Sequence, residues 1–297
     1  MEVCGKQIQF RGKLVRIAYL DVEGCQFLDN PELALTALRK SRSRADLLTF
    51  IQRVSRRSPE YGYPMEWDNF AVLPISTFDD WMKHQVHPKV RTKLRKAEKS
   101  GVTSREMPFG DELIKGVHAI YNESPVRQGR PFRHYGKDLE AVRNMTGTYL
   151  DESIFIGAFV EGEMIGFVKL LVDENGTQAR TLHVISMFQH RDKSPTNALL
   201  AQAVRSCAQR RIPYLVYGNF SYGKREADSL ADFKKHNGFQ KVEIPRYYVP
   251  LTLTGRVALR MGLHRTLLEW IPAPMIVQYR KIRSLWYARK FAGFEHA

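Results

Sequence analysis

The residues best suited to gripping a charged ligand are crowded into one short loop. The stretch ESPVRQGRPFRHYG, residues 123–136, lies between two expected helices and is punctuated by two prolines and two glycines. Guanidinium, imidazole and phenol groups at this density bind a carboxylate or phosphate through charge-assisted hydrogen bonds. The composition therefore predicts a ligand-binding loop, with an exposed basic loop as the simpler alternative. Its predicted contact residues are Arg127, Gln128, Arg130 and Tyr135.

A second charged pattern lies on a helix expected to begin at Phe78, behind a Thr77 cap, and to break at Pro88. Beyond the break, Arg91, Arg95 and Lys99 recur at i, i+4 and i+8 and so share one helical face. Such a face predicts contact with phosphate groups of a tRNA, a nucleotide-linked sugar or a coenzyme. A solvated basic face is the alternative. The formal net charge of +15 favours a polyanion or an anionic membrane as partner.

The elements that must position these residues follow a clear order between residues 153 and 239. Apolar and β-branched runs separated by turn residues predict three successive strands, and a helical repeat then starts at Ser194-Pro195. A further strand follows that helix, so a parallel pair joined by a helical crossover is expected. The expected strands are 153–160, 164–172, 180–187 and 214–220.

This order resembles the acyl-transfer core of the GNAT superfamily, and within it the Fem-type branch of aminoacyltransferases. The resemblance covers residues from about Gly101 to Pro250 and includes the basic lead-in RTKLRKAEKSGV. Phe233-Lys234 followed by Gly238-Phe239 looks like a spaced version of the Fem signature FK-x-GF. The fold class implied is α/β (α+β), a GNAT-like mixed sheet flanked by helices.

The resemblance implies transfer of an acyl or aminoacyl group onto an amine, from acyl-coenzyme A or aminoacyl-tRNA, with no tightly bound cofactor. A small molecule or a cell-envelope precursor would be the acceptor. Lys234 matches the Fem lysine near the donor channel, where its charge would stabilise the oxyanion. Glu123, His134 and His183 are the candidates for proton transfer, with core packing as the alternative for His183.

In the GNAT arrangement the two parallel strands separate at the crossover, and the donor carbonyl meets backbone amides there. On this chain that point lies between residues 185–188 and 214–218, beside a helix whose N-terminus would face an anionic donor group. Residues 189–196 lack the glycines with which GNAT enzymes hold the coenzyme A pyrophosphate, which argues against that donor. The predicted donor-binding residues are Ile185, Met187, Arg191, Ser194, Thr196 and Asn197. Helix capping alone is the alternative for Ser194. The loop 123–136 and Tyr217 would border the acceptor.

Three parts are predicted: a partial N-terminal GNAT-like lobe, residues 1–76; an acyltransferase core, residues 77–252; and a basic, amphipathic, helical C-terminal extension, residues 253–297. The extension combines apolar stripes with many Arg and Lys residues. It would either lie in an anionic membrane interface or pack against the core with its basic side in water.

Composition narrows the remaining classes. The three cysteines form no C-x-x-C pair, so neither a disulfide framework nor a metal site is predicted. The N-terminus lacks the apolar run of a secretory signal, and no apolar stretch is long enough to span a bilayer. We predict a cytoplasmic protein, or one peripheral on the inner face of the membrane. The competing function is a non-catalytic module of the same fold that binds nucleic acid or an anionic membrane through its basic surface.

Overall fold

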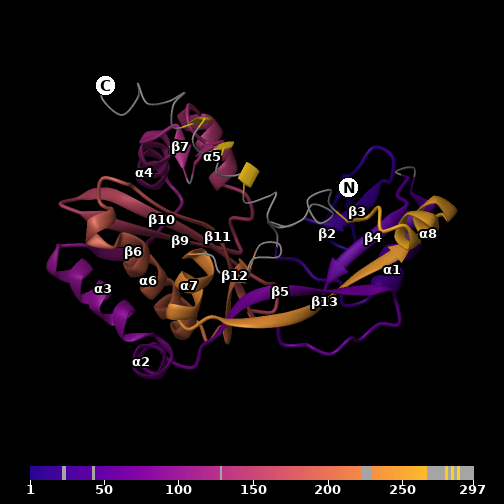
Figure 1. Ribbon diagram of the computed structural model, residues 1–297, viewed down its shortest axis with the longest axis horizontal. Coiled ribbons are helices and arrows are strands. Elements are labelled where there is room, and N and C mark those ends of the chain that lie inside the picture. Colours follow the sequence, from indigo (N-terminus) through magenta and orange to yellow (C-terminus); the bar gives the residue numbers. More distant parts are fainter. Residues whose placement is uncertain are drawn as a thin grey trace.

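The computed structural model describes residues 1–21, 25–41, 44–127, 129–221 and 229–265, and the pairs 278–279, 282–283 and 286–287. One sheet of eleven strands, ordered β1-β2-β3-β4-β13-β5-β12-β11-β10-β9-β6, runs through this part of the chain (Figure 1). Its strands are β1 (Glu2–Val3), β2 (Lys6–Arg11), β3 (Ile17–Leu20), β4 (Leu47–Ile51), β5 (Met65–Pro74), β6 (Thr103–Met107), β9 (Ser153–Val160), β10 (Glu163–Val172), β11 (Ala179–Ser186), β12 (Tyr214–Asn219) and β13 (Gln240–Pro250). The predicted mixed sheet is confirmed.

Helices cover this sheet on both faces. Figure 1 shows α4 and α5 above the strands β9 to β11, with α3, α6 and α7 below them. The helices are α1 (Pro31–Lys40), α2 (Phe78–Asp80), the π-helical turn η1 (Trp81–Gln85), α3 (Pro88–Lys99), α4 (Asp111–Asn122), α5 (Leu139–Thr146), the 3-10 turn η2 (Arg191–Lys193), α6 (Pro195–Gln209), α7 (Ser229–His236) and α8 (Leu253–Arg260). The Thr77 side chain caps α2, and Pro88 opens α3, as predicted.

Two crossovers give the sheet its parallel pairs. Helix α6 connects β11 to β12, which pair in parallel as the sequence predicts, and α1 connects β3 to β4 in the same way. All other neighbouring strands of the sheet are antiparallel. The described chain therefore contains one strand-helix-strand crossover near each end of its sheet.

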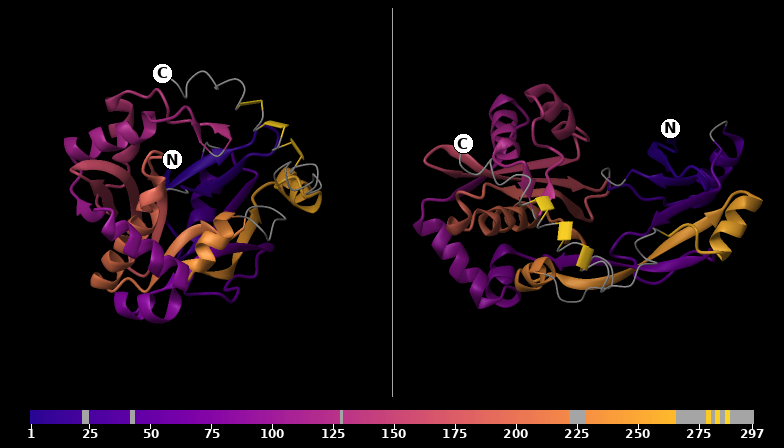
Figure 2. Two further views of the ribbon diagram at one scale, coloured as in Figure 1. Left: turned by 60° about the vertical axis from the view of Figure 1, so that its left-hand side comes forward. Right: turned by 45° about the horizontal axis from the view of Figure 1, so that its top comes forward.

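The long strands β5 and β13 connect these two ends. They pair from Gln240 with Val72 to Tyr247 with Met65, and Figure 2 shows them running along one side of the molecule. A large apolar core lies around β9–β12 and a smaller one around β2–β4. We call β6, β9–β12 and α2–α7 the large lobe, and β1–β4, α1 and α8 the small lobe.

The C-terminal extension departs from its prediction. The sequence predicts a helix from residue 254 that is interrupted only at residues 272–274, but α8 ends at Arg260. Gly262 adopts φ +71°, and the amides of Gly262 and Leu263 donate to the carbonyls of Leu259 and Ala258. This is a Schellman C-cap, for which Gly262 was the available sequence signal. Most of the rest of the extension lies outside the described residues, although three of its apolar residues, Tyr279, Ile282 and Trp286, are described and exposed. No helix within the described residues is long and apolar enough to cross a membrane.

Candidate active site

The parallel strands β11 and β12 separate soon after they meet. The structure describes both strands in full, and they pair only at Ala179 with Leu215 and at Arg180 with Val216. A β-bulge between β10 and β11 falls close to this point, since Lys169 pairs with His183 and Leu170 with Thr181. Bulges bend a strand and re-aim its side chains. The result is an opening between the carboxyl ends of the two strands, where the sequence predicts the donor carbonyl.

Lys234 reaches this opening from α7. Its side chain is fully buried, and its ammonium donates to the carbonyl of Asn219, the last residue of β12. The ammonium also lies 5.0 Å from the centre of the Tyr217 ring. A positive charge is therefore held at the end of one of the two separating strands. The Tyr217 ring lies beside that charge and packs against Phe233 and Phe239.

The predicted donor-binding residues line the start of the crossover. Ile185 is half-buried, Met187 is buried, and the Met187 amide donates to the Ile165 carbonyl at 2.8 Å. Arg191 is exposed. Thr196 Oγ1 lies 2.9 Å from Ser186 Oγ, which ties the first turn of α6 to the end of β11.

The start of α6 differs from a typical helix N-terminus. Ser194 occupies the N-cap position and Pro195 follows it, as predicted, but the Ser194 side chain makes no capping hydrogen bond. Its backbone is left-handed, with φ +57°, whereas capping side chains are normally carried on extended backbone. Asn197, one turn in, is buried, and its Nδ2 has no hydrogen-bond partner among the described residues.

Several backbone amides of the loop before α6 donate hydrogen bonds to carbonyls of the same loop. The amides of Arg191, Lys193, Ser194 and Asn197 donate to the carbonyls of Phe188, His190, Arg191 and Ser194 at 3.0–3.2 Å. Pro195 has no amide hydrogen. Few donors remain here for a pyrophosphate, which agrees with the missing glycines.

The loop 123–136 is less open than its composition predicts. Arg127 is half-buried, and its guanidinium donates to the carbonyls of Ser186 and Ile120 and to Glu123 Oε2, each at 2.8 Å. Burial lowers the pKa of the Arg127 guanidinium. Glu123 Oε1 in turn accepts the Gln189 amide at 3.0 Å. Arg127 and Glu123 thus hold the loop against the end of β11. Arg130 and Tyr135 are exposed, and Gln128 lies outside the described residues.

The structure brings His134 and His183 together. Their ring centres lie 5.7 Å apart, and His134 stacks on Tyr121 at 4.7 Å. Arg133 Nε lies 2.9 Å from His134 Nε2, so that nitrogen is an acceptor, while the buried Nδ1 has no partner among the described residues. Burial lowers the pKa of each histidine from 6.5 to about 4, helped by nearby positive charge. Both imidazoles are therefore neutral at pH 7, and in His134 the ring proton lies on Nδ1 because Nε2 accepts from Arg133.

These pKa values predict a loss of stability in mild acid. Between pH 6.5 and pH 4 the unfolded chain binds more protons than the folded one, so the free energy of unfolding falls as the pH falls. For His134 we expect a loss of roughly 2 kcal/mol between pH 7 and pH 5, at about 1.4 kcal/mol per pKa unit. Urea unfolding of the wild type and of His134→Phe would measure it. His134→Phe should lose less stability than the wild type on acidification. His84→Gln, which replaces an exposed histidine, should lose as much as the wild type. Equal losses in all three proteins would contradict a lowered pKa for His134.

A cavity of about 580 Å³ that the sequence does not predict lies between the two lobes. Its small-lobe wall includes Arg11, Tyr19 and Asp21, and its large-lobe wall includes Arg180 and Asn219. The carbonyl of Asn219 is the one that binds Lys234, so the buried ammonium lies directly behind the cavity wall.

Charges in the cavity are partly compensated. Arg246 Nε and Nη2 each lie 2.6 Å from Asp68 Oδ2, and the Tyr149 hydroxyl donates to Asp21 at 2.5 Å. The Arg11 guanidinium lies over the Tyr19 ring, 5.6 Å from its centre. The lining carries three arginines against two aspartates and therefore suits a ligand with an anionic group.

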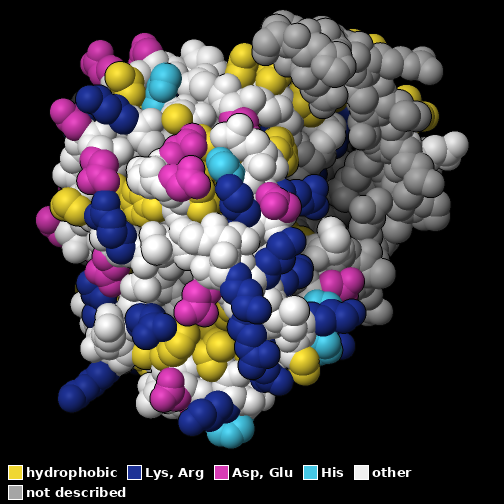
Figure 3. All heavy atoms as spheres, turned by 90° about the vertical axis from the view of Figure 1, so that its left-hand side faces the viewer, with side chains coloured by type: hydrophobic (Ala, Val, Ile, Leu, Met, Phe, Trp, Pro, Cys, Tyr) yellow, Lys and Arg dark blue, Asp and Glu magenta, His cyan; other side chains and the backbone are white. Residues whose placement is uncertain are grey.

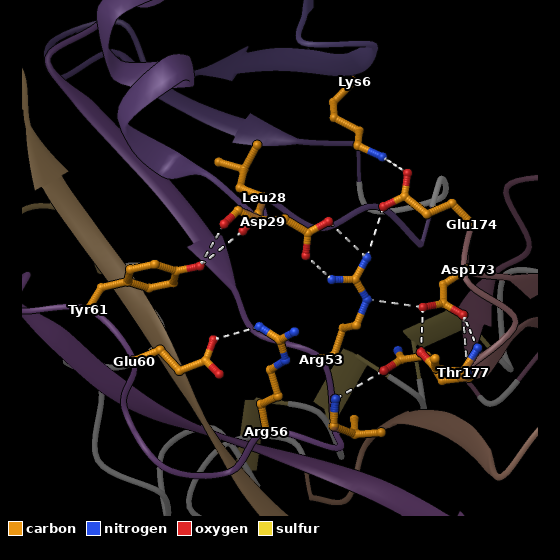
Figure 4. Close-up of polar contacts among 12 residues, drawn as sticks. Lys6, Leu28, Asp29, Arg53, Arg56, Glu60, Tyr61, Asp173, Glu174 and Thr177 are labelled. Atoms are coloured by element: carbon orange, nitrogen blue, oxygen red, sulfur yellow. Dashed lines mark hydrogen bonds and ion pairs between the residues drawn. The ribbon is translucent and has the colours of Figure 1, made fainter.

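One cluster of charges joins the lobes beside this cavity (Figure 4). Arg53 follows β4, and its guanidinium binds Asp29 of the small lobe and the turn residues Asp173 and Glu174 of the large lobe. The Arg53 and Asp173 side chains are 5% and 0% exposed, with Nε and Oδ2 3.2 Å apart. Asp173 also accepts the amides of Thr177 and Gln178. We call Asp29, Arg53, Asp173 and Glu174 the interlobe clasp.

The predicted phosphate-binding residues divide into two kinds. Arg91 is half-buried and donates to the carbonyls of Met82 and Val86, so it holds the turn before α3. Arg95 and Lys99 are exposed. Figure 3 views this end of the molecule and shows Lys and Arg side chains gathered on it. The exposed basic residues of α3 are Lys89, Lys93, Arg95, Lys96 and Lys99.

Comparison with known proteins places the fold. No family model matches the sequence, and no curated protein matches it. Among solved structures, FemX has a TM-score of 0.59 at 12% identity, over 86% of each chain. L-PGS from Bacillus licheniformis has a TM-score of 0.54 at 14% identity, over 87% of this chain and 86% of that one. The C-terminal DUF2156 domain of a provisionally named lysylphosphatidylglycerol synthetase from Agrobacterium fabrum has a TM-score of 0.56 at 13% identity, over 85% of this chain and 83% of that one. The chain therefore has the GNAT/Fem-like fold that the sequence predicts, at low sequence identity to the structures that share it.

Proposed function

We propose that this protein is a transferase that moves an aminoacyl group from aminoacyl-tRNA onto an amine. The observation that carries the proposal is the opening between β11 and β12, with the buried Lys234 ammonium at its end and a cavity behind the same wall. The matched structure from Agrobacterium fabrum is named for making lysylphosphatidylglycerol, which contains a lysyl group. That name supports aminoacyl chemistry on this fold.

The reaction asks little of the protein beyond positioning and charge. The acceptor nitrogen attacks the ester carbonyl, the carbon-oxygen bond to the tRNA ribose breaks, and a proton passes from the nitrogen to the departing ribose oxygen. Negative charge develops on the carbonyl oxygen between these events. Lys234 is the group placed to stabilise it, and the neutral His134 and His183 are candidates to carry the proton.

Two observations favour tRNA over coenzyme A as the donor. The amides at the crossover are largely occupied by carbonyls of the same loop, which weakens a pyrophosphate site. The outer side of α3 is basic over its whole length, and such a surface gains affinity for nucleic acid by releasing counterions. The interlobe cavity would then hold the acceptor, and the arginines in its lining would attract an anionic group on it.

Thermal unfolding with separate ligands tests the donor, because a ligand that binds only the folded state raises the melting temperature. We expect stabilisation by mixed aminoacyl-tRNA, and none by acetyl-coenzyme A or a long-chain acyl-coenzyme A. Recovery of the radiolabelled amino acid on the amine acceptor, as an amide, would then show transfer, whereas its release as free amino acid would show hydrolysis. Stabilisation by a coenzyme A thioester alone would replace the proposed donor.

The α3 surface gives a matched test of tRNA contact. Replacing Arg95 and Lys99 with Ala should weaken tRNA binding and reduce the slope of log affinity against log salt by about 2. The control replaces Arg39 and Lys40, an exposed basic pair at the end of α1 on the small lobe, and should leave the slope unchanged. Filter binding at several salt concentrations measures both. Equal slopes in the two variants would remove α3 from the tRNA surface.

A further inference from the structure

Helix α8 turns an apolar stripe toward solvent. Leu253, Val257 and Met261 follow one another at i, i+4 and i+8 and so lie on one side of the helix and its C-cap. Their exposed fractions are 74%, 55% and 59%. Apolar residues at this spacing normally face a protein core. Here the core-facing side belongs to other residues.

The opposite side of α8 is fixed firmly to the small lobe. Gly255 and Ala258 are buried, and a Cβ at Gly255 would come within 2.0 Å of the Asp46 carbonyl oxygen, so only glycine allows this approach. Thr252 caps the helix and donates to Asp46 Oδ1 at 2.7 Å. Beyond the helix, His264 Nε2 lies 3.0 Å from Glu66 Oε1. The stripe is therefore held outward by small buried residues and polar anchors on the other side.

Two arginines lie along the stripe. Arg256 and Arg260 are exposed, and their helical positions place them in a row next to Leu253 and Val257. Arg265 differs, because its guanidinium is bound to Glu66. The sequence from residue 251 to residue 268 contains neither Asp nor Glu. The outer side of α8 thus combines apolar and cationic groups without acidic ones.

We infer that α8 is a docking surface for an anionic lipid membrane. A shallow helix with an apolar row and adjacent cations inserts its apolar side chains at the acyl boundary and places its cations at the lipid phosphates. A second copy of this chain fits less well, since a two-fold contact through α8 would bring the arginine rows of two highly cationic chains together. Three side chains also offer far less area than the roughly 800 Å² per partner of a stable protein interface. This inference is independent of the proposed donor and reaction.

Vesicle co-sedimentation of the full chain tests it. We expect binding to vesicles of phosphatidylglycerol and phosphatidylcholine, weaker binding at higher salt, and little binding to phosphatidylcholine alone. The triple variant Leu253→Ser, Val257→Ser, Met261→Ser should lower the partition coefficient at least tenfold. Arg256→Ala with Arg260→Ala should reduce the preference for anionic vesicles by about thirtyfold, at about 1 kcal/mol per arginine near the surface.

The small lobe supplies matched controls. Leu33 on α1 is 57% exposed, so Leu33→Ser tests loss of an exposed apolar side chain outside the stripe. Arg39→Ala with Lys40→Ala removes the same charge as the α8 arginine pair. Both controls should bind vesicles like the wild type, with circular dichroism verifying that every variant is folded. A triple variant within twofold of the wild type overturns the inference, as does absence of binding at low salt. A wild-type dimer in sedimentation equilibrium that the triple variant abolishes, with no vesicle binding, would instead assign the stripe to a second copy.

Discussion

Lys234→Ala is expected to lower kcat of aminoacyl transfer by about 10²- to 10³-fold, the usual effect of removing one group that stabilises an oxyanion. The ammonium is fully buried at the opening between β11 and β12, where its charge interacts strongly with charge that develops nearby. Because the group acts mainly on the transition state, KM for the donor should change little. Steady-state kinetics with aminoacyl-tRNA as the varied substrate would measure both constants.

Two further variants separate chemistry from folding. Lys234→Met keeps most of the side-chain volume without the charge, so it should show the same kinetic loss with a smaller loss of stability than Lys234→Ala. Lys235, the next residue on α7, is exposed, and Lys235→Ala should leave kcat unchanged. If Lys234→Met retains wild-type turnover in a folded protein, the ammonium has no part in the reaction and supports β12 only.

The order of elements in the large lobe could be predicted because its signals are local. The turn between Val160 and Glu163 and the proline at position 195 each fix an element boundary within a few residues of sequence. The parallel pairing of β11 with β12 then follows from the length of the helical segment between them. The Phe-Lys and Gly-Phe signature in the sequence singles out Lys234. Its burial is a second reason to expect a role for it, and residue spacing alone does not predict that burial.

The cavity could not be predicted because its wall is assembled from distant residues. Arg11, Arg180 and Arg246 are isolated in the sequence and meet only when β2, β11 and β13 take their places around the cavity. Arg127 shows contacts that its sequence neighbourhood does not indicate. The density of cations around it predicts ligand binding, whereas its partners are the carbonyls of Ile120 and Ser186, which the loop reaches only in the folded chain. Its role in binding an acceptor stays a prediction.

The interlobe clasp, like the cavity, is assembled from residues that are far apart in the sequence. Because its charges are buried, a single substitution in it should destabilise the protein. Arg53→Met is expected to lower the free energy of unfolding by about 3–5 kcal/mol, because the buried Asp173 carboxylate would lose its guanidinium. Asp29, whose pKa its bond to Arg53 lowers, and Glu174 are more exposed and should contribute less. Urea unfolding at pH 7 measures the loss.

Arg56→Met is the matched control for that prediction. Arg56 lies three residues further on, is 52% exposed and pairs with Glu60 at 3.2 Å, so its loss should cost less than about 1 kcal/mol. A similar cost for the two variants would mean that burial does not set the strength of the clasp. A large cost for Arg53→Met alone would make the clasp a main connection between the lobes, in addition to the continuous strands β5 and β13. In that case the same substitution should also weaken binding of any ligand that needs both walls of the cavity, since the walls would no longer be held at a fixed separation.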